Sequence, residues 1–224
     1  MADFPFDIVL FDLDGTLVDS ALDLGPAVNH ALSLIDRKPV PLAKFRSMIG
    51  GGTDMMLSNA LHATGGDVDH TTYEILIATL HQHYWANIAE NTVPFPGCKA
   101  ALDTLAQRGC ALAICTNKSE KPARELLDAL GMTDHFAAIY GGDTLGWDRA
   151  KPKSHMLCAA IADCGGGRAA MVGDSTYDVR AAKAASVPMV TCRYGYHDVR
   201  LAELGGDATI DGLEDLVAAL EALG

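Results

Sequence analysis

Short, mostly apolar runs recur along this 224-residue chain, and three of them end directly in polar residues. The runs cover residues 6–11, 111–116, 169–174 and 187–192, with weaker ones at 136–142 and 207–212. Continuous apolar strands are typical of a parallel sheet that is covered on both faces. Helix-like stretches lie between these runs, at residues 99–109, 121–131, 153–165 and 177–186. This alternation predicts an α/β fold, a doubly wound and mostly parallel sheet.

One interval, from about residue 22 to about residue 88, breaks the alternation. It contains no convincing strand and reads as four helices, at residues 21–35, 42–49, 54–64 and 71–88. The segment 93–97, with two prolines and a glycine, is typical of a hinge or linker. We therefore expect an α/β core domain of residues 1–16 and 92–224, and a helical cap domain of residues 17–91.

Composition excludes several classes of partner. The formal net charge of -12 argues against general affinity for DNA or RNA, which requires a surface rich in lysine and arginine. The six cysteines form no Cys-x-x-Cys pair, which predicts free thiols in a reducing compartment. The N-terminus lacks the pattern of a signal peptide, and no apolar run is long enough to span a membrane. We expect a soluble, cytoplasmic monomer or homodimer.

The polar residues at the ends of the apolar runs carry the chemistry. They are Asp12, Asp14, Thr116, Asn117, Asp174 and Asp178, together with Lys151 before the third helix-like stretch. Doubly wound sheets bind ligands at the carboxyl ends of their strands, where these side chains would meet. Several carboxylates in one crevice repel one another unless a hard cation such as Mg²⁺ is bound, and a lysine and a hydroxyl suit a phosphoryl group. The set predicts phosphoryl transfer through an aspartyl-phosphate.

The motifs "DLDGTLVDS", "CTNK", "AKPKS" and "GDSTYD", in this order, resemble the four sequence motifs of the haloacid dehalogenase superfamily. The helical insertion after the first motif resembles the four-helix cap of that superfamily, so the resemblance covers nearly the whole chain. It implies a Rossmann-like core, Mg²⁺ as cofactor, and a small phosphorylated metabolite as substrate.

The resemblance also implies a role for each matching residue. Asp12 is expected to be the nucleophile and a metal ligand. Asp14 is expected to be the general acid and base, with its backbone carbonyl on Mg²⁺. Thr116, Asn117 and Lys151 would bind phosphate, Asp174 would bind the metal directly, and Asp178 would support the metal.

Individual residues of the motifs distinguish between subfamilies of the superfamily. Asp14 stands where the dehalogenases have Tyr, the phosphonate hydrolases have Ala and the P-type ion pumps have Thr, which favours a phosphatase or a phosphomutase. Leu24 stands where sugar phosphomutases usually have His. The chain is most similar to the phosphoglycolate phosphatases, which implies 2-phosphoglycolate as substrate. The alternatives are a β-phosphoglucomutase-like mutase, a pyrophosphatase, and a non-catalytic protein that binds a phosphate ligand.

Three further features of the sequence concern the surroundings of the site. The glycines Gly50, Gly51 and Gly52 are either a flexible turn or a cap loop whose backbone approaches the substrate. His81 and His83 face apart on the predicted helix, so we expect solvated histidines. The segment 193–198 follows a strand and is expected at the edge of the crevice, without an assigned role.

Overall fold

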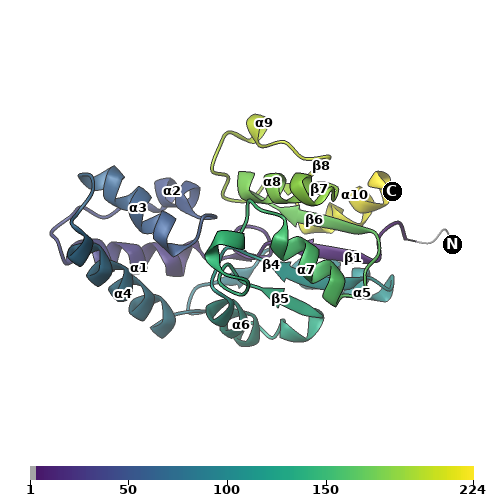
Figure 1. Ribbon diagram of the computed structural model, residues 1–224, viewed down its shortest axis with the longest axis horizontal. Helices are drawn as coiled ribbons and strands as arrows, with labels where there is room; N and C mark the ends of the chain where they lie inside the picture. Colours follow the sequence, from purple (N-terminus) through teal and green to yellow (C-terminus); the bar gives the residue numbers. More distant parts are fainter. Residues whose placement is uncertain (1–3) are drawn as a thin grey trace.

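The computed structural model describes residues 4–224 and consists of an α/β unit with a helical insertion at one end (Figure 1). The α/β unit contains a six-stranded sheet with strand order β5-β4-β1-β6-β7-β8, in which every pairing is parallel. Its strands are β1 (Ile8–Phe11), β4 (Ala111–Cys115), β5 (Ala138–Tyr140), β6 (Ala169–Gly173), β7 (Met189–Cys192) and β8 (Ala208–Ile210). The predicted fold class is confirmed.

The central strand β1 shows why its sequence is continuously apolar. Val9 lies opposite Leu112 of β4 on one side and Ala170 of β6 on the other. Side chains alternate between the two faces of a strand, and here Val9 and Phe11 belong to one buried cluster while Ile8 and Leu10 belong to another. Both faces of β1 are therefore buried.

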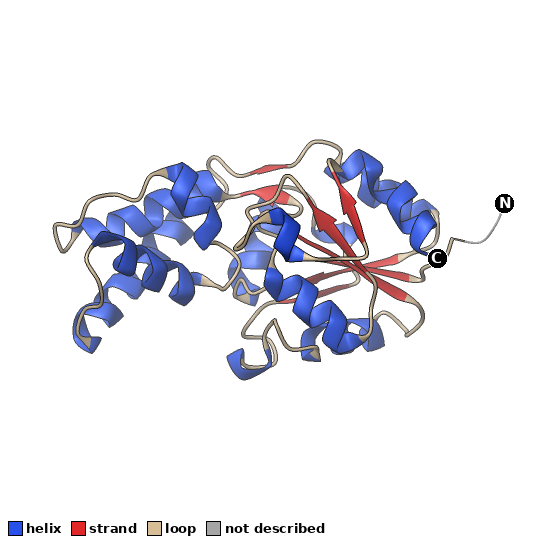
Figure 2. Ribbon diagram, turned by 90° about the horizontal axis from the view of Figure 1, so that it is seen from above, coloured by secondary structure: helices blue, strands red, loops and turns tan. Residues whose placement is uncertain are grey.

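Helices cover both faces of the sheet (Figure 2). Apolar residues of α5 (Cys98–Gln107), α6 (Glu120–Ala129) and α10 (Leu216–Leu223) pack in the cluster that contains Val9. Those of α7 (His155–Asp163) and α8 (Thr176–Ala185) pack in the other cluster. The remaining short elements are α9 (Leu201–Leu204) and the 3₁₀ turns Thr133–His135, Trp147–Arg149 and Leu213–Asp215. Since the chain moves from β1 to β4 on one side and later to β6 on the other, β1 lies at the topological switch point, where ligands bind in such sheets.

The insertion contains the four expected helices. They are α1 (Ala21–Ser33), α2 (Leu42–Phe45), which continues into the 3₁₀ turn Arg46–Met48, α3 (Thr53–Thr64) and α4 (His70–Ala86). A separate apolar cluster joins them, with Leu24 and Val28 of α1, Leu57 of α3, and Leu76 and Leu80 of α4 all buried. The insertion therefore has a core of its own.

The two chain segments that join the insertion to the sheet unit lie side by side. β2 (Val18–Asp19) and β3 (Val93–Pro94) form an antiparallel two-stranded ribbon, which the sequence did not predict. The buried carboxylate of Asp23 in α1 accepts hydrogen bonds from the backbone N–H groups of Asn91 and Thr92 and from both of their side chains. The expected hinge segments are thus held together.

Within residues 4–224, no helix is both long and apolar enough to cross a membrane. All six cysteines fall in this described range and are free thiols, four of them buried.

Candidate active site

Three neighbouring strands place the site at their carboxyl ends. Asp12 follows β1, Thr116 follows β4 and Asp174 follows β6. The backbone N–H of Asp12 still donates to the carbonyl of Val172, 3.0 Å away, so the parallel ladder fixes the position of Asp12. The expectation that these residues meet at one edge of the sheet is confirmed.

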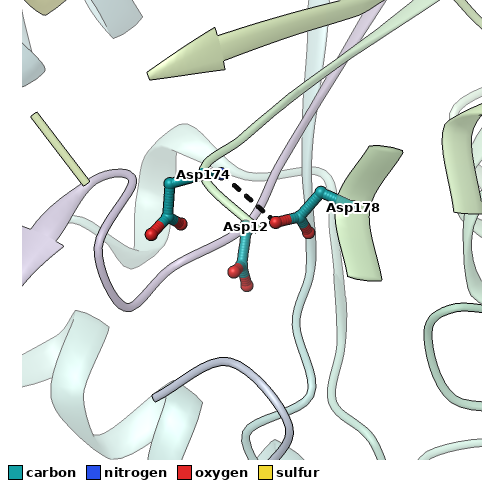
Figure 3. Close-up of side chains that lie close together, drawn as sticks. All are labelled: Asp12, Asp174 and Asp178. Atoms are coloured by element: carbon teal, nitrogen blue, oxygen red, sulfur yellow. Dashed lines mark hydrogen bonds between the residues drawn. The ribbon is translucent and has the colours of Figure 1, made fainter. Parts of the chain in front are cut away.

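Asp12, Asp174 and Asp178 converge on one point (Figure 3). All three are buried, and each offers a carboxylate oxygen within 4.8 Å of those of the others. Burial raises the pKa of Asp12 to about 6, although the neighbouring Lys151 opposes this change. Burial, together with the charges of Asp12 and Asp178, raises the pKa of Asp174 well above its usual range. The protein alone therefore stabilises these charges incompletely.

A hard divalent cation fits this cluster. Its donors are all oxygens, the ligand type that Mg²⁺ prefers. Oδ1 of Asp12 lies 3.0 Å from the ammonium of Lys151, yet no donor among residues 4–224 makes a well-aligned hydrogen bond to it. A cation bound here would supply the missing positive charge.

Asp174 is held in place through both of its oxygens. The hydroxyl of Thr16 donates to Oδ1 at 2.8 Å, and the backbone N–H of Tyr196 donates to Oδ2 at 2.7 Å. Gly15, between Asp14 and Thr16, has a φ of 88°, and a Cβ there would collide with the carboxylate of Asp174. Glycine is therefore required at position 15 for the first loop to approach Asp174 this closely.

Asp178 serves mainly to orient its neighbours. Its Oδ1 accepts from the ammonium of Lys151 at 2.5 Å. Its Oδ2 accepts from the hydroxyl and backbone N–H of Ser175 and from the backbone N–H of Asp174. Because so many donors already occupy this carboxylate, it orients Lys151 and Asp174. The expected role of Asp178 as a supporting carboxylate at the metal stays a prediction.

The expected phosphate-binding residues lie beside Asp12. Lys151 is buried, and although burial alone would lower its pKa, the carboxylates of Asp12 and Asp178 outweigh this effect and raise the pKa. A hydrogen bond from Thr116 helps to stabilise the ionised form of Asp12. The side-chain amide of Asn117 donates to the carbonyls of Lys151 and Gly50, at 3.1 Å and 3.0 Å. Lys151 is thus kept charged next to Asp12.

The carboxylate of Asp14 has other partners than the three clustered aspartates. It accepts from the hydroxyl of Ser20 at 2.6 Å and from the ammonium of Lys118 at 3.0 Å. Asp14 follows Asp12 by two residues, so it lies beside the cluster without being one of its members. The side chain of Asp14 is thus held by Ser20 and Lys118 outside the cluster, and its role in proton transfer stays a prediction.

Lys118 is a buried residue of the site that was not predicted from the sequence. Its side chain is 5% exposed, and its ammonium lies 4.5 Å from the ring centre of Tyr84 in α4. The signal was present in "CTNK", where Lys118 follows Asn117, but a lysine in a loop is solvated by default. Its burial depends on Asp14 and Tyr84, which are distant from it in sequence.

A cavity of about 320 Å³ lies between the sheet unit and the insertion. Its walls combine loop residues of the sheet unit with residues of the insertion, among them Asp14, Thr116, Lys118, Gly50, Gly52 and His81. The clustered carboxylates of Asp12, Asp174 and Asp178 do not line it, and neither does Lys151, so the cavity opens on the Asp14 side of the site.

The structure separates the three glycines of the cap loop. Gly50 and Gly52 line the cavity and have φ values of 120° and 87°, a region that favours glycine. Gly51 does not line this cavity, and a Cβ there would meet Met55 and the hydroxyl of Tyr177 at 2.9 Å. The loop therefore reaches the site through Gly50 and Gly52, and its role in binding stays a prediction.

His81, expected to be solvated, is half-buried. Nε2 of His81 lies 2.8 Å from the hydroxyl of Thr53, and the ring lines the cavity. Burial lowers the pKa of His81. Helix α3 begins at Thr53 beside α4, and this packing is invisible in the local sequence.

The segment 193–198 connects the site to the ribbon. The hydroxyl of Tyr196 accepts hydrogen bonds from the backbone N–H groups of Ser20 and Ala21, at 2.7 Å and 3.0 Å, and donates to Asp19. Since its own N–H holds Asp174, Tyr196 links the metal cluster to the first turn of α1.

We expect Tyr196→Phe to lower the free energy of unfolding by about 1–3 kcal/mol, because two buried N–H groups lose their acceptor. Urea denaturation measures this loss. The matched control is Tyr194→Phe, which removes one hydrogen bond, to the carbonyl of Thr16, and should cost about 1 kcal/mol. Equal losses in the two variants would contradict the linking role of Tyr196.

Known proteins share this architecture. A family model described as haloacid dehalogenase-like hydrolase matches residues 6–186. The phosphoglycolate phosphatase of Mesorhizobium japonicum is 38% identical over 213 residues, which cover 95% of this chain and 94% of the relative. That of Rhodospirillum rubrum is 40% identical over 214 residues, covering 93% and 88%.

The solved structures agree. A crystal structure of a predicted phosphoglycolate phosphatase from Haemophilus somnus has a TM-score of 0.89 and 27% identity, and the match covers 96% of this chain and 97% of the other. These matches confirm the resemblance that the four motifs indicated. The chain belongs to the haloacid dehalogenase-like hydrolase family.

Proposed function

We propose that this protein is a Mg²⁺-dependent phosphatase that hydrolyses 2-phosphoglycolate through an aspartyl-phosphate on Asp12. The observation that carries the proposal is the position of Asp12, which lies between the ammonium of Lys151 and the carboxylates of Asp174 and Asp178. The names of the relatives that match nearly the whole chain support the choice of substrate. The choice of Mg²⁺ is supported by the cluster of three buried carboxylates, whose oxygens could hold a metal ion.

The first chemical step depends on positive charge near Asp12. Asp12, Asp174 and the backbone carbonyl of Asp14 would hold Mg²⁺, which supplies positive charge against the repulsion between carboxylate and phosphate. Lys151 and Thr116 bind and orient the phosphoryl group. A carboxylate oxygen of Asp12 then attacks phosphorus, and the bond from phosphorus to the ester oxygen breaks.

Asp14 moves the protons of both steps. It donates a proton to the departing ester oxygen, so that glycolate leaves as an alcohol. It then takes a proton from the water that attacks phosphorus of the aspartyl-phosphate. This attack releases inorganic phosphate and restores Asp12. The hydrogen bond from Ser20 keeps the carboxylate of Asp14 oriented.

We further propose that residues 17–91 act as a cap over a core of residues 1–16 and 92–224. The separate apolar clusters and the paired crossings at β2 and β3 support this division. The cavity between the two units would enclose a small substrate and limit access of water to the aspartyl-phosphate.

The direct test is release of inorganic phosphate from 2-phosphoglycolate by the purified protein, with Mg²⁺ and with EDTA. We expect turnover with Mg²⁺ and none in EDTA. Turnover of other small phosphomonoesters but not of 2-phosphoglycolate would overturn the choice of substrate. Full activity in metal-free protein would overturn the dependence on Mg²⁺.

Mg²⁺ should also stabilise the protein, and more so at higher pH. Because the pKa of Asp12 is raised in the folded state, the metal-free folded protein binds more protons than the unfolded chain between about pH 4 and pH 6. Its stability therefore falls as pH rises through this window. Mg²⁺ binds the ionised carboxylates, so its effect grows over the same range.

At a hundredfold excess over its Kd, Mg²⁺ should contribute about 2.7 kcal/mol at pH 8, which raises Tm by roughly 5–10 °C. The shift should be much smaller at pH 5. Thermal unfolding with Mg²⁺ and with EDTA measures both, and Asp174→Asn should lose most of the shift. A shift that is equal at both pH values would contradict the carboxylate cluster as the binding site.

A further inference from the structure

Lys118 is a buried cation to which the proposed chemistry gives no task. Its ammonium is 3.0 Å and 3.2 Å from the two oxygens of Asp14, and within the described part of the chain Asp14 is its sole carboxylate partner. Lys151, the other buried cation of the site, has two carboxylate partners, Asp12 and Asp178. Lys118 thus has the less complete set of partners.

The surroundings of Lys118 suit an anionic ligand. Lys118 and Tyr84 both line the cavity. An ammonium has three N–H donors, and both contacts of Lys118 with a carboxylate go to one residue. The hydroxyl of Tyr84 is buried and has no well-aligned hydrogen-bond partner among residues 4–224. The cavity wall therefore offers the ammonium of Lys118 to a ligand, and the buried hydroxyl of Tyr84 lies close to that ammonium.

The position of Lys118 relates this subsite to the bond that breaks. Asp14 would protonate the departing ester oxygen, and the ammonium of Lys118 contacts the carboxylate of Asp14 directly. A group bound to Lys118 therefore lies next to the ester oxygen, on the alcohol side of the substrate. Of the residues expected to bind the phosphoryl group, Thr116 and Asn117 line the cavity and Lys151 does not, so the cavity runs from the phosphate side to Lys118.

We propose that Lys118, with the hydroxyl of Tyr84, binds a carboxylate on the leaving group of the substrate and selects phosphate esters of short hydroxy acids. This inference rests on the proposed phosphatase function and adds a specificity-determining residue to it. 2-Phosphoglycolate has a carboxylate one carbon from the ester oxygen, and its negative charge complements the ammonium of Lys118. Tyr84 comes from the insertion, so the subsite forms where the two units meet.

The wild-type protein alone gives the first test. Three phosphate esters of similar size differ in the group beside the ester carbon: 2-phosphoglycolate has a carboxylate, 2-hydroxyethyl phosphate a hydroxyl, and phosphoethanolamine an ammonium. We expect kcat/KM to fall about tenfold to a hundredfold from the carboxylate to the hydroxyl, the usual value of a hydrogen bond to a charged group. It should fall further for the ammonium, which Lys118 repels.

The second test removes the charge. Lys118→Met keeps the length of the side chain, and it should reduce the preference for 2-phosphoglycolate over 2-hydroxyethyl phosphate to less than about threefold. The matched control is Lys183→Met, since Lys183 is an exposed lysine of α8 that does not line the cavity and should leave this ratio unchanged. If Lys118→Met fails to fold, the three-ester series on the wild-type protein decides the question.

The outcomes separate this inference from the proposed function. If Lys118→Met lowers kcat/KM equally for both esters, Lys118 positions Asp14 only, and the inference is overturned. If the wild-type protein hydrolyses all three esters equally well, the inference fails while the phosphatase function stands. If the protein hydrolyses neither these three esters nor any other phosphomonoester, the proposed function fails as well.

Discussion

Asp12→Asn should lower kcat for 2-phosphoglycolate by at least about 10⁴-fold, the scale of losses when a nucleophile is removed. An amide has no negative charge and is a poor nucleophile toward phosphorus. The substitution should not unfold the protein, because Asp12 is one of three buried carboxylates that repel one another. In EDTA at pH 8 we expect the variant to be at least as stable as the wild type.

The matched control is Asp7→Asn, which makes the same change near the start of the same β1 segment, where the side chain is exposed. It should retain wild-type kcat. Phosphate release and urea denaturation, measured on both variants, separate loss of chemistry from loss of fold. Near-normal turnover by folded Asp12→Asn would remove Asp12 from the role of nucleophile.

Lys151→Met should damage both stability and activity. The buried ammonium pairs with Asp12 at 3.0 Å and with Asp178 at 2.5 Å. Without it, two buried carboxylates lose their partner, and breaking a buried ion pair costs about 3–5 kcal/mol. The variant also lacks the ammonium that would contact the phosphoryl group. This loss should lower kcat/KM by a further factor of roughly 10²–10³.

Comparing the stability loss of Lys151→Met with Mg²⁺ and in EDTA distinguishes loss of the Lys151–Asp12 ion pair from simple disruption of the core. Because bound Mg²⁺ would partly neutralise Asp12, we expect Lys151→Met to lose less stability with Mg²⁺ than in EDTA. Urea denaturation under both conditions measures the difference. Lys153→Met, an exposed lysine of the same loop, should change neither stability nor kcat/KM. An equal loss with and without Mg²⁺ would mean that Lys151 and the metal site are independent.

The sequence predicted the parts of this site that follow strands. A buried parallel strand reads as a continuous apolar run, so Asp12, Thr116 and Asp174 could be located from the ends of their runs. The topology of a doubly wound sheet then brings these ends together. The helices of the insertion could be located for a similar reason, since helical spacing of apolar residues is a local signal.

What the sequence missed depends on contacts between distant segments. Lys118 is buried because Asp14 and Tyr84 lie on either side of it, and both positions follow from how the insertion packs on the sheet unit. Tyr196 reaches both Asp174 and α1 for the same reason. The ribbon of β2 and β3 has two residues in each strand, which is too short for a periodic pattern.

In the proposed mechanism, Asp12 carries a phosphoryl group during turnover. The most direct test quenches the Mg²⁺-loaded wild-type protein in acid during hydrolysis of 2-phosphoglycolate. Borohydride then reduces the acyl phosphate to an alcohol, and peptide mass spectrometry locates the change. We predict that it lies at Asp12 and is absent when substrate or Mg²⁺ is omitted. Reduction at another residue, or none at any residue during active turnover, would contradict the account.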